Sequence, residues 1–148
     1  MIASLRLYFS ASLLALLIMS SSTQAATWFA LEAPDSISGI TVEVDLESLR
    51  SRGEKRDVVT RITYPQPQKK QDLSFQSVIA ELEISCVNDL DNWKSISFFT
   101  SDKAQGKALS SERFGAVGVP RNVLKMLPDK AWAILQRSAC GTAETTSP

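Results

Sequence analysis

The chain of 148 residues is long enough for one domain and too short for two of ordinary size. Its 16 Lys and Arg residues balance its 16 Asp and Glu residues, which disfavours a nucleic-acid binder because such proteins usually carry a basic excess. The sequence has no histidine, the most common general base and metal ligand. We therefore expect no enzyme activity, no catalytic residues, and no bound metal or cofactor.

The first 25 residues have the pattern of a cleavable signal peptide. Arg6 supplies the positive charge, residues 13–19 are apolar, and residues 23–25 (Thr-Gln-Ala) suit a cleavage site after Ala25. An uncleaved membrane anchor is the alternative, but the apolar stretch is short for a bilayer. We expect a periplasmic or secreted protein with no stable membrane anchor after cleavage and a single mature domain over residues 26–141.

The first half of the mature domain is predicted to form strands. Residues 28–33 form a short apolar stretch that suits a first strand. Residues 40–46 and 57–64 alternate between apolar and polar side chains, as strands with one buried face do. The polar residues between the two alternating stretches contain Gly53, which predicts a hairpin turn. Two prolines within residues 65–71 predict an exposed loop, because proline is excluded from central strands.

Residues 77–86 are also predicted to form a strand. A helix is the alternative, since Ala, Glu and Leu favour helices, but alternation fits this stretch better than a period of 3.6 residues. The residues expected on the apolar face are Val78, Ala80, Leu82, Ile84 and Cys86.

Residues 93–101 are predicted to be a central strand with apolar side chains on both faces. Strict alternation places Ile96 and Phe98 on one face, and Trp93 and Phe99 on the other.

The C-terminal part contains a weaker strand and the best helix. Residues 108–114 are more polar and suit an edge strand. Residues 122–127 are predicted to form one helical turn, and residues 128–140 form a helix started by a proline and followed by a glycine. The apolar stripe of this helix consists of Trp132, Leu135 and Ala139. Residues 142–148 are expected to be a disordered tail.

Cys86 and Cys140 are the two cysteines of the mature chain. An exported protein meets an oxidising compartment, so the pair predicts a disulfide, with two free thiols as the alternative. The bond would close a loop of roughly 55 residues and stabilise the domain by roughly 4 kcal/mol. The expected fold class is α+β: an antiparallel β-sheet of about five to six strands with a C-terminal α-helix packed on it and tethered by the disulfide.

An ordered pattern of residues along the mature chain resembles the surface-adhesin E-like domain of Gram-negative bacteria. The pattern consists of Trp28, then Asp45, Ser48, Leu49 and Gly53, then Cys86, then Phe98, Phe99 and Gly106, and finally the proline-started helix that ends in Cys140. The resemblance implies a small antiparallel sheet with a disulfide-tethered helix. It also implies binding to host extracellular-matrix and plasma proteins. The chain departs from the pattern in lacking a lipid-attachment cysteine and a tryptophan before the final proline.

Two basic clusters and one tryptophan are the candidate partner-binding residues. They are Arg50, Arg52, Lys55 and Arg56 around the predicted turn, Lys69 and Lys70 beside the prolines, and Trp93. The alternatives are a solvated turn, a solubilising loop and core packing.

The carboxylates on the polar strand faces have a plainer interpretation. These residues are Glu43, Asp45, Glu81 and Glu83. Paired carboxylates can perform acid–base work or bind a cation, but cross-strand ion pairs with Arg61 or Lys94 explain Glu81 and Glu83 more simply. Asp45 and Ser48 are predicted to cap local backbone donors in a turn at the end of a strand.

The leading functional hypothesis is an exported, non-enzymatic module that binds a host matrix or envelope protein. A second hypothesis is an envelope accessory protein that self-associates, for example as a homodimer, through a sheet edge. A third is a small-ligand carrier, which would require a cavity between the helix and the sheet.

Overall fold

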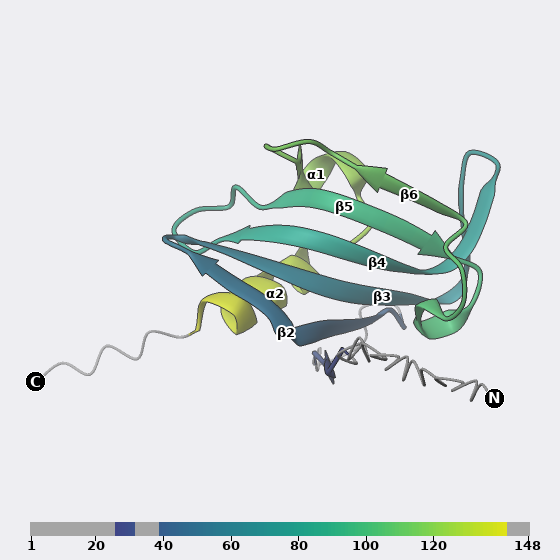
Figure 1. Cartoon of the computed structure of the whole chain (residues 1–148), viewed down its shortest axis with the longest axis horizontal. Coiled ribbons are helices and arrows are strands. Elements are labelled where there is room, and N and C mark those ends of the chain that lie inside the picture. The colour runs from purple at the N-terminus through teal and green to yellow at the C-terminus, as the bar shows by residue number, and fades with distance from the viewer. Residues whose placement is uncertain (1–25, 32–38, 142–148) are drawn as a thin grey trace, which may run out of the picture.

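The computed structural model describes residues 26–31 and 39–141. The predicted signal peptide and the predicted tail lie outside the described residues. One antiparallel sheet has the strand order β1-β2-β3-β4-β5-β6, and β7 also pairs with β5 (Figure 1). The strands are β1 (Trp28–Ala30), β2 (Thr41–Arg52), β3 (Lys55–Lys70), β4 (Leu73–Ser85), β5 (Asn92–Phe99), β6 (Ser110–Arg113) and β7 (Val119–Pro120). The helices are η1 (Asp102–Ala104), α1 (Arg121–Leu124) and α2 (Asp129–Cys140).

Alternation along the strands builds the core between the sheet and its helices. Both α1 and α2 lie on the same face of the sheet (Figure 1). On that face, Val42, Ile62, Val78 and Phe98 form one cross-strand row, and all four are buried. Each such side chain contributes about 1.5–3 kcal/mol on burial. The predicted fold, an antiparallel sheet with a C-terminal helix, is confirmed.

Strand β4 settles the choice between strand and helix for residues 77–86. Val78, Ala80, Leu82 and Ile84 are all fully buried on the helix-covered face. The side chains between them point to the opposite face, where Glu81 is partly exposed and Ile79 is half-buried. Alternation predicted this strand correctly because one face of it is covered.

The β2–β3 hairpin turns where the sequence predicted. Gly53 and Glu54 are the two residues between the paired Arg52 and Lys55. Gly53 has a φ of 61°, a conformation that glycine adopts without steric cost and that two-residue hairpin turns require.

A bulge in β5 overturns the predicted face of Trp93. Ser95 is opposite Glu81 and Trp93 is opposite Leu82, so Lys94 is an extra residue in β5. An extra residue reverses the alternation beyond it. Trp93 therefore lies on the same face as Ile96 and Phe98, whereas strict alternation separated them.

The prediction of a loop over residues 65–71 was also wrong. Strand β3 continues to Lys70, and the turn to β4 is at residues 71–72. The pairing jumps from Thr63 opposite Ser77 to Gln68 opposite Phe75. Both prolines lie inside this jump, where no ladder hydrogen bond is needed. We call residues 65–73 the arm, because they extend the hairpin beyond the regular sheet.

The Cys86–Cys140 disulfide is confirmed. Its sulfur atoms are 2.06 Å apart and its Cα atoms 5.5 Å apart, within the usual range. The bond joins the residue after β4 to the last residue of α2. Trp132 and Leu135 of α2 are buried against the sheet, so the helix is held by packing along its apolar stripe and by the disulfide at its end.

Candidate functional site

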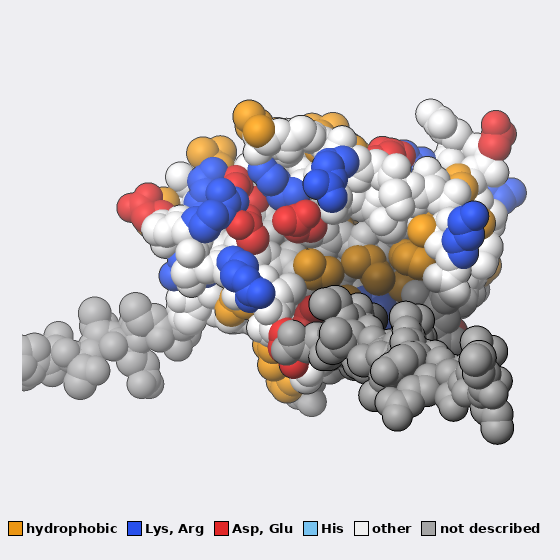
Figure 2. All heavy atoms as spheres, in the orientation of Figure 1, with side chains coloured by type: hydrophobic (Ala, Val, Ile, Leu, Met, Phe, Trp, Pro, Cys, Tyr) orange, Lys and Arg blue, Asp and Glu red, His pale blue; other side chains and the backbone are white. Residues whose placement is uncertain are grey.

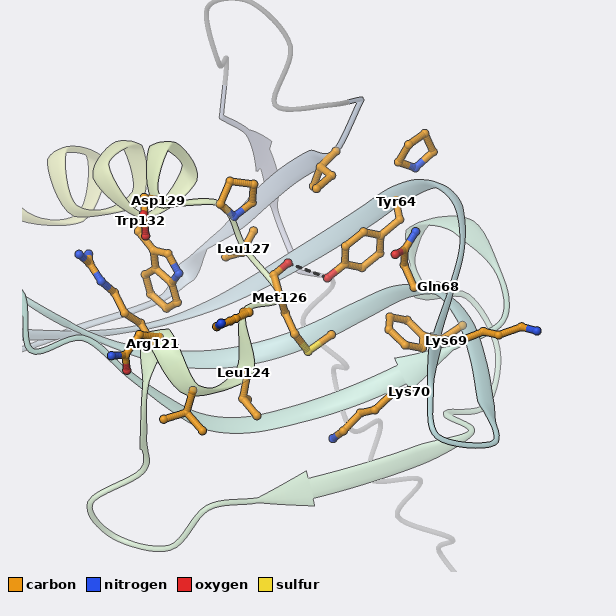
Figure 3. A pocket seen from close by; sticks show the side chains of 17 residues that line it. Tyr64, Gln68, Lys69, Lys70, Arg121, Leu124, Met126, Leu127, Asp129 and Trp132 are labelled. Carbon is orange, nitrogen blue, oxygen red and sulfur yellow. Dashed lines mark hydrogen bonds between the residues drawn. The ribbon is translucent and has the colours of Figure 1, made fainter.

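A groove of about 910 Å³ opens on the helix-covered face of the sheet. It lies between the arm and residues 121–128, which we call the linking segment because they join β7 to α2 (Figure 3). The apolar part of its lining includes Ile40, Tyr64, Phe75, Leu124, Met126 and Trp132.

The groove exists because α2 covers only part of the sheet. The helix begins at Asp129 and packs on β3 and β4. The linking segment crosses the sheet ahead of it, and two contacts hold its C-terminal part there. The Tyr64 hydroxyl donates a hydrogen bond to the Met126 carbonyl at 3.0 Å (Figure 3), and Leu127 is buried in the core. Burial raises the pKa of Tyr64, which keeps the hydroxyl protonated as the donor.

Aromatic rings form a rigid base beneath the groove. Tyr64 meets Phe75 edge to face with ring centroids 5.8 Å apart, and Phe75 meets Phe98 in the same way at 4.9 Å. On the α2 side, Trp132 packs edge to face on Trp93 at 5.2 Å. Such pairs contribute about 0.5–1.5 kcal/mol beyond the area that they bury.

A buried ion pair anchors the start of the linking segment. The Arg121 Nη1 donates to the Asp91 Oδ2 at 3.2 Å, and the Arg121 backbone N–H donates to the Asp91 carbonyl at 3.0 Å. Asp91 is 1% exposed, and its Oδ1 accepts the Ser85 N–H at 2.8 Å. Burial raises the pKa of Asp91 although Arg121 opposes the shift. Arg121 is therefore a structural residue of the groove wall.

Gly118 brings the chain close to β5 just before this anchor. Its φ is 82°, and a Cβ atom there would lie 2.6 Å from the Trp93 carbonyl oxygen. Only glycine fits this approach, which lets β7 pair with β5 and sets the position of the linking segment.

The rim of the groove is mainly basic. The lining contains Lys69, Lys70, Arg121 and Lys125 against one carboxylate, that of Asp129. Lys70 forms an ion pair with Glu112 at 2.7 Å and lies 5.0 Å from the Phe98 ring centroid. Lys69 and Lys125 are exposed and form no ion pair within the described residues.

A second basic surface lies at the opposite end of β3. We call it the basic tip; it consists of Arg50, Arg52, Lys55 and Arg56. The carboxylate of Glu83 accepts hydrogen bonds from Arg52 at 2.9 Å and from Lys55 at 2.7 Å. Arg52 also pairs with Asp57 at 2.5 Å, and this hydrogen bond raises the pKa of Arg52 further.

The remaining two arginines of the basic tip have no carboxylate partner in the described part of the chain. The Arg50 Nη1 donates to the Glu47 carbonyl at 2.6 Å, and the Arg56 Nη1 donates to the Gly53 carbonyl at 2.7 Å. These local bonds fix each guanidinium while leaving its charge uncompensated. We call the face of the sheet that α1 and α2 do not cover the open face. On this face, Lys and Arg side chains gather at the end of the sheet opposite the arm (Figure 2).

The structure separates the candidate partner-binding residues into three places. The basic tip and the Lys69–Lys70 pair lie at opposite ends of β3. Trp93 is 0% exposed and its Nε1 donates to the Arg121 carbonyl at 3.2 Å. Trp93 is therefore a core residue and cannot anchor a partner at the surface, because the bulge at Lys94 turns it inward.

The carboxylates on the open face are used in structural contacts. Glu43 forms a bidentate pair with Arg61 at 2.6 and 2.7 Å, and Arg61 also stacks on Trp28 at 4.4 Å. Glu81 forms no ion pair among the described residues, so the predicted partner for it is wrong. Glu83 pairs with the basic tip and with Lys94 at 3.9 Å.

Asp45 and Ser48 each accept a backbone N–H group as expected, a local one for Asp45 and a cross-strand one for Ser48. The Asp45 Oδ1 accepts the Glu47 N–H at 3.1 Å, and the Ser48 hydroxyl donates to the Asp45 carbonyl while accepting the Val59 N–H at 2.8 Å. They do so inside a bulge of β2, between Asp45 and Arg50, rather than at a strand end. No group of three or more acidic or cysteine ligands that could hold a metal occurs within residues 26–31 and 39–141.

Comparison with known families decides the class of this domain. Residues 28–141 match the surface-adhesin protein E family. The chain belongs to that family. No curated protein and no solved structure matches it. Membership implies an exported or surface location for this adhesin domain. None of the helices in the described portion has the length and apolar character to cross a bilayer.

The groove is the feature of this adhesin domain that the sequence did not reveal. Tyr64 was predicted in a strand and Lys69 and Lys70 in a loop, but nothing predicted that the arm would face the linking segment. The sequence signals that mark the two sides of the groove are the pair of prolines within the arm, which interrupts regular strand pairing, and the proline just before α2. Their meeting depends on long-range packing.

Proposed function

We propose that this chain is an exported, non-enzymatic surface-adhesin module that binds a host matrix or envelope protein through its basic tip. In this proposal residues 1–25 direct export and are removed, and the mature domain is periplasmic or secreted. The partner presents an acidic segment to the tip. Support comes from membership of the surface-adhesin protein E family and from Arg50 and Arg56 of the tip, which have no carboxylate partner among the described residues.

The proposal rests on the contacts of the Arg50 and Arg56 guanidinium groups. Both side chains are fixed by bonds to nearby backbone carbonyls, so little side-chain freedom is lost when a carboxylate docks. Arginine is enriched among residues that dominate interface energies, and its remaining N–H donors suit bidentate carboxylate binding. Arg52 and Lys55 are already bonded to Glu83 and serve to build the tip.

Charge reversal at the tip tests the proposal. The mature domain, residues 26–148, is applied to immobilised matrix and plasma proteins and to purified envelope proteins in a binding assay. For a protein that binds, R50E/R56E should weaken binding at least about tenfold, with a faster dissociation rate and a smaller salt dependence. K69E/K125E is the matched control, because it reverses two lysines of the groove rim that form no ion pair within the described residues. Equal binding by the wild type and R50E/R56E would refute a role for the tip.

The outer edge of β6 supports self-association as a second candidate function. β6 ends the strand order, and within the described residues nothing pairs with its outer side. Uncovered edges can pair with another chain, although this one is only four polar residues long. Sedimentation equilibrium of the mature domain distinguishes the two, since a dimer that forms with rising concentration would favour the edge.

A further inference from the structure

We propose that the groove binds a small amphipathic anion, specifically a free carboxylate on a flexible acyl chain. The chain would lie between the arm and the linking segment, and the carboxylate would meet the lysines of the rim. This site is separate from the basic tip, because the two occupy opposite ends of β3. It therefore adds a ligand-binding function to the proposed protein-binding one.

The walls of the groove suit a flexible apolar chain. Ile40, Leu124 and Met126 line it and are only partly buried, so apolar surface is available for a ligand to cover. Two of these side chains are aliphatic and the third is a flexible thioether, which adapts to chains of irregular shape. The volume of about 910 Å³ lies within the range of about 300–1,000 Å³ typical of small-molecule sites.

The base of the groove is already formed. Tyr64 and Phe75 are almost completely buried and pack edge to face, and the Tyr64 hydroxyl bond to Met126 fixes the opposite wall. A ligand would not have to order the aromatic base or the linking segment when it binds. A preformed site loses less conformational entropy on binding.

The rim charges select an anion. The charges of Lys70 and Arg121 are balanced by ion pairs with Glu112 and Asp91. Lys69 lies on the arm and Lys125 at the end of α1, and both are exposed. Asp129 supplies the one carboxylate in the lining of the groove. Lys69 extends outward from the arm (Figure 3), whereas the Lys70 ammonium reaches Glu112 of β6. The four-carbon stems of exposed lysines rotate freely and can cover apolar surface while the ammonium groups meet a carboxylate.

Titration calorimetry with dodecanoate tests this proposal on the mature domain, at concentrations below micelle formation. We expect one molecule to bind per domain, and dodecanol, which has the same chain without the charge, to bind at least about tenfold more weakly. K69E/K125E should weaken dodecanoate binding by a similar factor and leave dodecanol unchanged. R50E/R56E, which makes the same change of charge at the far end of β3, should bind dodecanoate as the wild type does.

Three results would overturn the proposal. These are no heat of binding up to about 1 mM dodecanoate, equal affinity for dodecanoate and dodecanol, and equal weakening by K69E/K125E and R50E/R56E. Arg50, Lys69 and Lys125 are exposed and Arg56 is partly exposed, and circular dichroism establishes that the variants fold. A second variant, Leu124→Glu, places a carboxylate on the apolar wall and should weaken both ligands. No partner protein is involved, so failure here leaves the proposed role of the basic tip unaffected.

Discussion

Glu83 joins the basic tip to the centre of the sheet. It is 4% exposed and accepts hydrogen bonds from Arg52, Lys55 and Asn92. We expect Glu83→Gln to lower the free energy of unfolding by about 1–2 kcal/mol, because Arg52 and Lys55 lose their anionic acceptor and keep only a neutral amide as partner. Urea unfolding at pH 7 measures this change. Glu81→Gln is the matched control, since Glu81 lies two residues away on the same face and, among the described residues, its carboxylate accepts a hydrogen bond only from Ser95, at 3.5 Å.

The effect of Glu83→Gln should depend on pH. Burial opposes ionisation of Glu83, but hydrogen bonds from Lys55 and Asn92 and nearby positive charges outweigh it and lower its pKa. A carboxylate with a lower pKa in the folded state stabilises the fold above its unfolded pKa of about 4.3 and loses that contribution as pH falls through the folded pKa. The difference between the wild type and Glu83→Gln should therefore shrink below about pH 4. A difference that stays constant to pH 3 would contradict this.

At the scale of elements, the sequence predicted the parts whose periodicity is regular. One covered face keeps an apolar residue at every second position of β4 from Val78 to Ile84, with Ile79 as an additional apolar residue on the other face. The stripe containing Trp132 and Leu135 marks α2. Bulges in β2, β3 and β5 were not predicted, because an extra residue is recognised only against the strand that it pairs with. That is why the face of Trp93 was predicted wrongly.

The disulfide ties two of these elements, and removing it should weaken α2 first. We expect Cys86→Ser with Cys140→Ser to cost up to roughly 4 kcal/mol, the chain-entropy value for the closed loop. Trp132 and Leu135 still pack on the sheet, so the sheet should fold while the last turn of α2 exchanges its amide protons faster. Urea unfolding and hydrogen exchange measure the two effects. Reduction of the wild type should reproduce them, and an unchanged unfolding midpoint would contradict the expected stabilisation.

At the scale of the whole molecule, the long strand β3 keeps two basic surfaces apart. The sequence predicted two basic clusters, one with Arg50 and Arg56 around a turn and one with Lys69 and Lys70 in a loop, but not that one strand would join them. Their separation follows from the extension of β3 over sixteen residues, and the groove follows from the packing of the linking segment beside the arm. Neither is encoded in a local pattern, since both depend on contacts between segments far apart in sequence.

Export determines whether this adhesin domain reaches the compartment in which Cys86 and Cys140 form their bond. Small residues at positions 23–25 predict cleavage after Ala25, and an oxidising compartment favours the disulfide. The intact mass of protein recovered from the periplasm should therefore correspond to a chain that begins at Ala26. An alkylating reagent should label neither thiol until a reductant is added, and two afterwards. A full-length mass would refute cleavage, whereas labelling before reduction would show that the bond does not form in the cell.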